Sequence, residues 1–288
     1  MFIKLMNFRT LQGKTIAITG ATGGLGKELV FYMARLGASL ILLDRNPTKS
    51  RELGEFLQQN FKDLEIDYIT TDLENFESVK SSANELKKRK IDVFIHNAGA
   101  YSIPRRKCDT GYDNVFQINF ISPYYIIREI LPYLKERVII VGSIAHNYSK
   151  IRENDIDFSL CKKASKVYGN AKRFLMFSLF EFFKNEEKIK LSVTHPGITF
   201  TNITAHYPKL IFMIIKHPMK IIFHSPKKAM LNISEGLFCD CGYNEWIGPR
   251  FFNVWGKPKL KKLSTCKQEE SQIIASTAEE IYNKLKEF

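Results

Sequence analysis

Tyr168 and Lys172 lie four residues apart in the stretch 166–172, KVYGNAK. On a helix this spacing stacks two side chains on one face, so an ammonium group would lie beside a phenol. A free phenol has a pKa near ~10 and is a poor base at neutral pH, whereas a neighbouring positive charge favours the phenolate. The pair therefore predicts proton exchange with an alcohol or a ketone. Alone it is weak evidence, because a chain with 12 tyrosines gives on the order of one such match by chance.

A glycine-rich turn is the second candidate. The stretch 19–26, TGATGGLG, lies between an apolar run and a helical pattern. Free backbone amides and a helix N-terminus both favour negative charge, and glycines let a ligand approach them closely. The turn therefore predicts a nucleotide pyrophosphate site, formed by Gly20, Thr22, Gly23, Gly24, Leu25 and Gly26.

The charged pair Asp44 and Arg45 follows about 20 positions after the glycines, at the end of a second apolar run. A carboxylate here is expected to bind the adenosine ribose hydroxyls, while an arginine favours a 2′-phosphate. The choice between NAD and NADP stays open, with a lean to NAD because the carboxylate would repel the phosphate.

The elements that would position these residues alternate along the chain. Short apolar runs are predicted to be strands at 14–19, 39–44, 64–70, 91–96, 137–142 and 189–195, and segments of helical length separate them. Strands that are apolar throughout and alternate with helices predict an α/β fold with a doubly wound parallel sheet, covered by helices on both faces. Residues 1–288 are expected to form a single domain, because no linker or repeat divides them.

Composition excludes several classes of protein. The five cysteines lack paired spacing, so neither disulfides nor a metal site is predicted. The net charge of +13 is spread along the chain as lysine, which argues against nucleic-acid binding. Neither a secretory signal nor an apolar run of membrane-spanning length is found, so a cytoplasmic protein is expected. The histidines His146, His206, His217 and His224 are interpreted as polar surface or lid residues.

Taken in order, these motifs resemble the short-chain dehydrogenase/reductase family over nearly the whole chain. The resemblance rests on TGATGGLG, Asp72-Leu73, NAG at 97–99, Asn119, Ser143, YGNAK and HPGITFT at 195–201. The spacing of 25 positions from Ser143 to Tyr168, and the HPG triplet, are similar to the retinol-dehydrogenase-like branch. His96 and Ser122 depart from the family pattern without removing a catalytic group.

The resemblance implies a role for each matching residue. Tyr168 would be the general acid/base, Lys172 would lower its pKa and hold the nicotinamide ribose, Ser143 would bind the substrate oxygen, and Asn119 would order a water. The remaining cofactor contacts implied are Asp72 and Leu73 at the adenine, Asn97, Ala98 and Gly99 near the ribose, and Pro196, Gly197, Ile198 and Thr201 at the nicotinamide.

The segment 202–228, where the family places a lid, indicates the class of substrate and a possible contact with a membrane surface. Its apolar content predicts a hydrophobic alcohol, ketone or aldehyde as substrate. Lysines there, and the basic patch GKPKLKKL at 256–263, suggest peripheral contact with a membrane; the competing interpretation is core packing or a homo-oligomer interface. A non-catalytic nucleotide-binding sensor or scaffold stays as the alternative function, and an epimerase or dehydratase is disfavoured because such relatives carry a larger substrate domain.

Overall fold

The parallel sheet expected from the sequence is present, and it has two more strands than the six predicted. The computed structural model describes residues 9–198 and 225–288. Eight strands pair in the order β3-β2-β1-β4-β5-β6-β7-β8. Their bounds are β1 Thr15–Thr19, β2 Ser39–Asp44, β3 Ile66–Thr70, β4 Ile91–His96, β5 Leu134–Val141, β6 Lys190–Thr194, β7 Glu245–Phe251 and β8 Trp255–Lys262.

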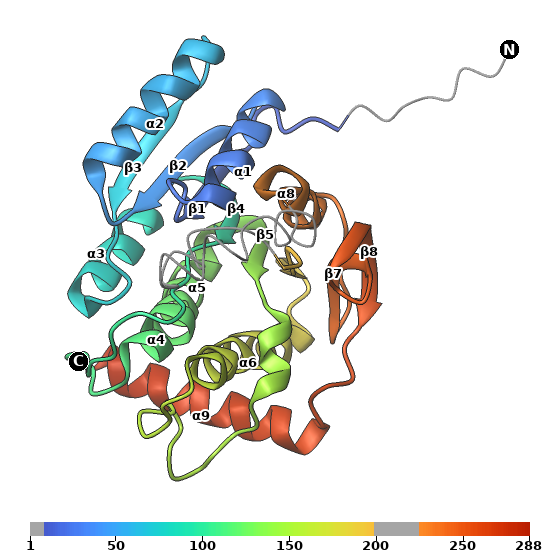
Figure 1. The fold of residues 1–288 in the computed structure, drawn as a ribbon. Helices are drawn as coiled ribbons and strands as arrows, with labels where there is room; N and C mark the ends of the chain where they lie inside the picture. Colours follow the sequence, from blue (N-terminus) through green and yellow to red (C-terminus); the bar gives the residue numbers. More distant parts are fainter. Residues whose placement is uncertain (1–8, 199–224) are drawn as a thin grey trace, which may run out of the picture.

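Helices cover both faces of the sheet (Figure 1). Their bounds are α1 Gly24–Arg35, α2 Pro47–Asn60, α3 Phe76–Lys87, α4 Asn114–Phe116, α5 Ser122–Ile130, α6 Ala164–Phe182, α8 Pro226–Ser234 and α9 Gln268–Lys286. Helices α1, α2 and α8 pack on one face, and α3, α5, α6 and α9 pack on the other. Gly37, two residues after the end of α1, has a φ of +89°, which suits glycine.

Alternate side chains of each strand face the two helical layers that cover the sheet. On β1, Ile16 and Ile18 face the α1 side while Ala17 faces the α6 side. Successive side chains of a strand point to opposite faces, and here both faces are covered, so the run is apolar throughout. Six strands were predicted in this way, and all six are present.

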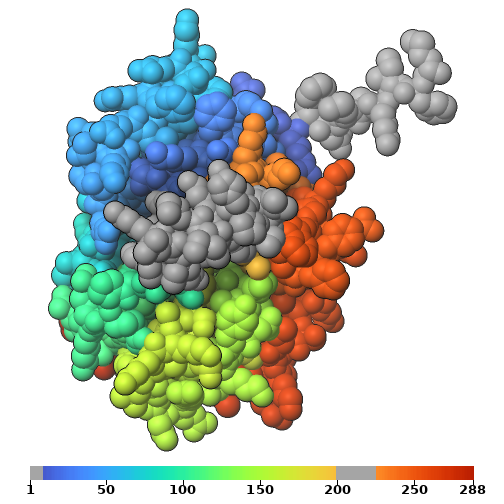
Figure 2. Space-filling model, viewed as in Figure 1, coloured from blue at the N-terminus to red at the C-terminus, as the bar shows by residue number. Residues whose placement is uncertain are grey.

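The hairpin β7–β8 was not predicted. Strand β7 pairs parallel with β6, and β8 then returns antiparallel to β7 at the edge of the sheet. The basic patch at 256–263, for which the sequence suggested peripheral membrane contact, therefore lies mostly on an edge strand. Figure 2 shows this hairpin as orange-red surface at one margin of the molecule.

The C-terminal helix α9 packs along α6 through Ile274, Ala278 and Ile281. The apolar face of this amphipathic helix therefore lies in the core. In the described part of the chain, no helix is both long and apolar enough to span a bilayer. Residues 199–224, which include Thr201 and most of the expected lid, lie outside the described residues. Of the rest of the expected lid, Ser225 caps α8 and residues 226–228 begin it.

Candidate functional site

Two turns meet where the strand order reverses, between β1 and β4. The hydroxyl oxygen of Thr19 accepts hydrogen bonds from the backbone amides of Asn97 and Ala98, both at 3.1 Å. The Asn97 side chain donates to the backbone carbonyls of Thr19 and Gly20, at 3.2 and 3.0 Å. Ligands of open α/β sheets bind in the crevice at such a reversal. Asn97 therefore fixes the two walls of this crevice to each other.

The glycines of the first turn differ in what they permit. Gly20 has a φ of +69°, and a Cβ on it would lie 3.0 Å from the Ala98 Cα. A Cβ on Gly26 would lie 2.1 Å from the Gly20 carbonyl oxygen, whereas a Cβ on Gly24 would meet nothing within 4 Å. Gly20 and Gly26 therefore close the turn, and Gly24 leaves the N-terminus of α1 open to a ligand. This cradle fits a pyrophosphate.

Asp44 lies at the end of β2 and is 4% exposed. One carboxylate oxygen accepts hydrogen bonds from the Thr22 amide and hydroxyl, at 3.0 and 2.9 Å, and the other accepts from the Ser50 hydroxyl at 3.0 Å. Arg45 is exposed and forms no ion pair with any residue of the described ranges. Asp44 thus braces the glycine turn through Thr22, a contact that the sequence did not reveal.

Asp72 and Leu73 continue the same edge of the sheet, two and three residues after β3. An Asp72 side-chain oxygen accepts a hydrogen bond from the Glu74 amide at 3.0 Å. The Leu73 side chain is buried, and its carbonyl accepts a hydrogen bond of 2.6 Å from the Ser122 hydroxyl. Ser122, one of the two departures from the family pattern, therefore ties the helix that follows Asn119 to this wall.

The other departure, His96, is fully buried at the end of β4. Its Nδ1 lies 3.0 Å from the Thr19 hydroxyl, and its Nε2 has no hydrogen-bond partner among the described residues. Burial first, and then the nearby Lys172, hold the pKa of His96 well below its usual value. His96 is therefore a neutral side chain beneath the crevice.

Helix α6 carries Tyr168 and Lys172 on one face, as their spacing predicted. The Lys172 Nζ lies 5.7 Å from the centre of the Tyr168 ring and donates a hydrogen bond of 2.9 Å to the Val141 carbonyl. The Ser143 hydroxyl, two residues after β5, lies close enough to the phenol to lower the pKa of Tyr168. Tyr101, from the loop after β4, packs edge-on against Tyr168 with 5.4 Å between ring centres. Three of the four predicted catalytic side chains thus lie together.

Burial dominates the electrostatics of this pair. It raises the pKa of Tyr168 to about 12, against a smaller lowering by the Ser143 hydrogen bond. It also lowers the pKa of Lys172 to about 7. The protein groups alone therefore favour a neutral phenol and a weakly basic amine. The expected lowering of the phenol pKa by Lys172 is not produced by these groups, because Lys172 itself loses charge when it is buried.

Asn119 completes the group from a short π-helical segment, Gln117–Ile121, between α4 and α5. Its amide nitrogen donates to the Ala100 and Val115 carbonyls, each at 2.8 Å, and its oxygen accepts from the Ala100 amide at 3.2 Å. A Cβ on Gly99 would lie 2.9 Å from the Asn119 side-chain oxygen and 3.7 Å from the Lys172 Nζ. The absence of a side chain at Gly99 therefore leaves room for both Asn119 and Lys172. The π-helical turns that carry residues such as Asn119 are frequent at functional sites.

A second layer behind Ser143 was missed in the sequence. His146 was expected at the surface, but it is fully buried; its Nδ1 donates to the Ser143 carbonyl at 2.6 Å, and its Nε2 lies 2.7 Å from the Thr265 hydroxyl. Arg173, next to Lys172, pairs with Glu270 at 2.6 Å and donates to the Thr265 carbonyl. The segment joining β8 to α9 thus supports the turn that carries Ser143, and no local pattern signals such a distant contact.

The HPG triplet follows β6. His195 stacks on Trp246 with 5.0 Å between ring centres, and its Nε2 donates to the Asn253 carbonyl at 3.1 Å. Gly197 has a φ of +84°, so the chain turns sharply after Pro196. Ile198 is the last described residue before the gap. Pro196, Gly197 and Ile198 lie at the carboxyl edge of the sheet, as expected for a wall of the crevice.

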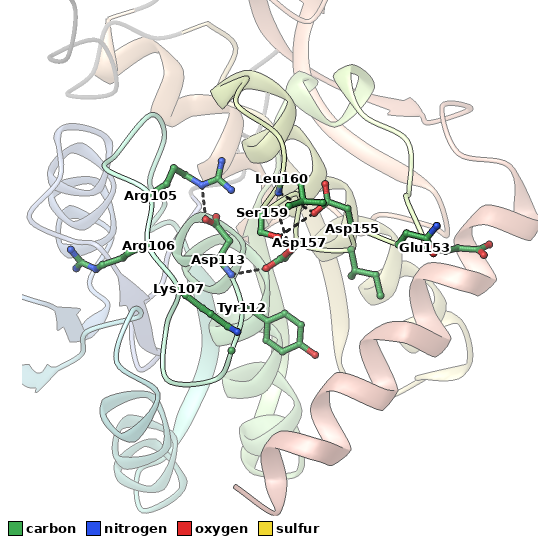
Figure 3. Close-up of a pocket in the computed structure, with 13 residues that line it drawn as sticks. Arg105, Arg106, Lys107, Tyr112, Asp113, Glu153, Asp155, Asp157, Ser159 and Leu160 are labelled. Atoms are coloured by element: carbon green, nitrogen blue, oxygen red, sulfur yellow. Dashed lines mark hydrogen bonds and ion pairs between the residues drawn. The ribbon is translucent and has the colours of Figure 1, made fainter.

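A surface pocket of about 620 Å³ opens beside this site, between the loops 105–113 and 153–160 (Figure 3). Arg105 pairs with Asp113 and donates to the Phe158 and Cys161 carbonyls, each at 3.0 Å. Phe158 in turn packs against Val167, next to Tyr168. The pocket lining is charged, so it suits a polar solute, and its Arg105 contacts fix the loop that precedes α6.

The fold and the site define a doubly wound α/β protein with a glycine cradle and a Tyr-Lys-Ser-Asn group at one sheet edge. A family model described as short chain dehydrogenase matches residues 14–209. The chain therefore belongs to the short-chain dehydrogenase family. Among the described residues, no cluster of metal-ligating side chains is present.

Curated relatives place the chain near retinol dehydrogenases. It is 28% identical over 214 residues to retinol dehydrogenase 14 of Mus musculus, covering 68% of this chain and 64% of the relative. It is 25% identical over 261 residues to retinol dehydrogenase 12 of Bos taurus, covering 84% and 82%. Polyprenol dehydrogenase of Homo sapiens is 24% identical over 203 residues, covering 66% and 62%. The chain thus spans slightly under two thirds of the first and third of these relatives.

Solved structures share the fold. An uncharacterised protein of Mycobacterium paratuberculosis superposes with a TM-score of 0.72 at 20% identity, covering 97% of this chain and 95% of the other. A short-chain dehydrogenase of Sphingobium yanoikuyae, in complex with NADPH, gives 0.59 at 18% identity, covering 78% and 84%. One from Burkholderia phymatum, in complex with NAD, gives 0.58 at 17% identity, covering 80% and 87%. The second and third of these structures thus contain NADPH and NAD, respectively.

Proposed function

We propose that this protein is an NAD(P)-dependent oxidoreductase that interconverts a hydrophobic alcohol and its ketone or aldehyde. The observation that carries the proposal is the convergence of Tyr168, Ser143 and Lys172 at the sheet edge that also holds the glycine cradle. The substrate class rests on the apolar segment 202–228 and on the likeness to retinol and polyprenol dehydrogenases.

The proposed chemistry assigns each side chain a proton task. A bound nicotinamide cofactor would supply the hydride chemistry. Tyr168 donates its proton to a carbonyl oxygen in reduction and takes it back in oxidation, and Ser143 hydrogen-bonds the same oxygen. Lys172 would hold the ribose of the cofactor and, when charged, would favour the phenolate. Asn119 orders a water that continues the proton path to solvent.

The test is a screen of ketones and alcohols with NADH and NADPH, followed by absorbance. Tyr168→Phe is expected to lose turnover by at least about 10²-fold, because it removes the general acid/base, while still binding the cofactor. Tyr148→Phe is the matched control, since it removes an exposed phenol nearby. Turnover that survives unchanged in Tyr168→Phe would refute the mechanism, and cofactor binding without any turnover by the wild type would favour the sensor or scaffold.

For the cofactor we propose a preference for NAD. Asp44 keeps its carboxylate at the end of β2, held by Thr22 and Ser50, where it would repel a 2′-phosphate. We expect Asp44→Asn to raise kcat/KM with NADPH relative to NADH, and Arg45→Ala to lower the same ratio. A wild type that uses NADPH better, with no change in Asp44→Asn, would contradict this assignment.

A further inference from the structure

The β7–β8 hairpin ends in exposed aromatic side chains. Phe252 is 86% exposed, Phe251 is 54% exposed and Trp255 is 41% exposed. Phe251 and Trp255 are paired across the hairpin, so they lie on the same face, with Phe252 beside them at the turn. We call these three residues the aromatic tip. Such a group of exposed aromatic side chains in one short segment indicates an interaction surface.

Phe252 is an unfavourable residue for the backbone conformation of this turn. Its two central residues, Phe252 and Asn253, have φ values of +49° and +57°, and the Val254 amide closes it onto the Phe251 carbonyl. Hairpin turns of this kind favour asparagine and glycine, because bulky side chains are strained at positive φ. A phenylalanine that is both strained and exposed contributes little to folding. We therefore expect Phe252 to contact a partner outside the chain.

The strands behind the aromatic tip are basic. Residues 246–263 contain Arg250, Lys257, Lys259, Lys261 and Lys262 and no acidic residue. Lys257, Lys259 and Lys262 are exposed and make no ion pair with any residue that the structure describes. Burial and the adjacent Lys259 both lower the pKa of Lys261, which shows mutual repulsion of these charges. An anionic surface would relieve that repulsion.

We propose that the β7–β8 hairpin docks the protein on an anionic lipid bilayer, with the aromatic tip in the interface and the lysines at the headgroups. Tryptophan and phenylalanine favour the membrane interface, and lysines near it bind anionic lipid. A second copy fits less well, because lysines on an edge strand oppose strand pairing between like chains. A single-stranded nucleic acid fits less well, since the aromatic side chains lie at a projecting turn instead of along a groove.

Docking here would bring the active site to the lipid. The Asn253 carbonyl at the turn accepts the hydrogen bond from His195, and a Cβ on Gly248 would lie 3.7 Å from the His195 Cβ. His195 directly precedes Pro196 and Gly197 of the cofactor wall. Docking through the hairpin would therefore place the site close to the bilayer. The benefit of this placement for catalysis rests on the proposed function, in which the substrate is hydrophobic.

Vesicle co-sedimentation of the full chain tests the docking, with phosphatidylcholine vesicles that contain or lack phosphatidylserine, at low and high salt. We expect binding only to the anionic vesicles and weaker binding at high salt. Phe252→Ser should weaken it about tenfold or more, and Lys257→Glu with Lys259→Glu about 25-fold or more. The matched controls are Phe56→Ser, on the exposed side of α2, and Lys62→Glu with Lys284→Glu, which change the charge equally.

Intrinsic fluorescence gives an independent measurement. Trp246 is 1% exposed, so quenching by brominated lipid is expected to come from Trp255. Equal binding by tip and control variants, absence of quenching, or binding only to an oligonucleotide or a second copy would overturn the proposal. The measurement needs neither substrate nor cofactor, and Tyr168→Phe should bind vesicles like the wild type. Failure of the proposed catalysis and failure of the docking are therefore distinguishable.

Discussion

Replacing Lys172 with methionine is expected to stabilise the protein at low pH while it abolishes activity. Lys172 is 2% exposed, and burial lowers the pKa of its amine from 10.5 to about 7. Below pH 7 the folded protein must hold a charged amine out of water, whereas methionine has a similar shape and no charge. Functional groups of this kind commonly lower stability.

The magnitude follows from linkage between protonation and folding. The penalty is absent above pH 10.5, where folded and unfolded chains are both neutral, and grows as the pH falls to 7, because only the unfolded chain takes up the proton there. It amounts to about 5 kcal/mol at pH ~6 and less than ~1 kcal/mol at pH ~10. Methionine also leaves the Val141 carbonyl without its donor, at a cost of about 1–3 kcal/mol at any pH. The expected net gain is therefore about 2–4 kcal/mol at pH ~6, turning to a slight loss at pH ~10.

Urea unfolding of wild type and Lys172→Met across this pH range measures the effect. The difference in the free energy of unfolding should shrink by about 4 kcal/mol from pH ~6 to pH ~10. Lys284→Met, on the exposed side of α9, is the matched control and should show little change. A variant that is less stable at pH ~6, or a difference that does not depend on pH, would show that burial does not destabilise the charged amine.

Three other substitutions test the support of the site. Gly26→Ala should prevent folding, because its Cβ would lie 2.1 Å from a carbonyl oxygen of the same turn; a thermal transition like that of the wild type would contradict this. Glu270→Gln leaves the guanidinium of Arg173, 3% exposed, without its carboxylate, and should cost about 3–5 kcal/mol in urea, unlike Glu269→Gln. Burial lowers the pKa of His195 to about 3, so wild-type stability should fall as the pH drops below 6.5, and His195→Gln should reduce that slope in the same assay.

Local signals in the sequence were enough to predict the six parallel strands β1 to β6 and the helical segments between them. The run 14–19 is apolar because both of its faces are buried, and Gly37 ends α1 because only the left-handed conformation fits there. Tyr168 and Lys172 share a face because one helical turn separates them. In each case a short segment determines its own conformation, so its pattern is readable without knowledge of the fold.

Contacts between distant segments were not readable. His146 was expected at the surface because a polar side chain in a loop is usually exposed, yet Thr265 and Trp246, more than 90 residues away, bury it. Strand β8 was not recognised because lysines and a proline interrupt its apolar pattern, and such residues suit an edge strand. The partners of Asp44 were equally hidden, since Ser50 and Thr22 meet it only in the folded protein.

These distant contacts also explain how one end of the chain supports chemistry on α6. Glu270 at the start of α9 neutralises Arg173, and Arg173 donates to the carbonyls of His146 and Thr265. His146 then holds the Ser143 carbonyl. Because Arg173 and His146 are buried, loss of one of their partners leaves an unpaired polar atom instead of a hydrated one. Removal of α9 should therefore disturb the Ser143 turn as well as the core, even though no residue of α9 lies in the crevice.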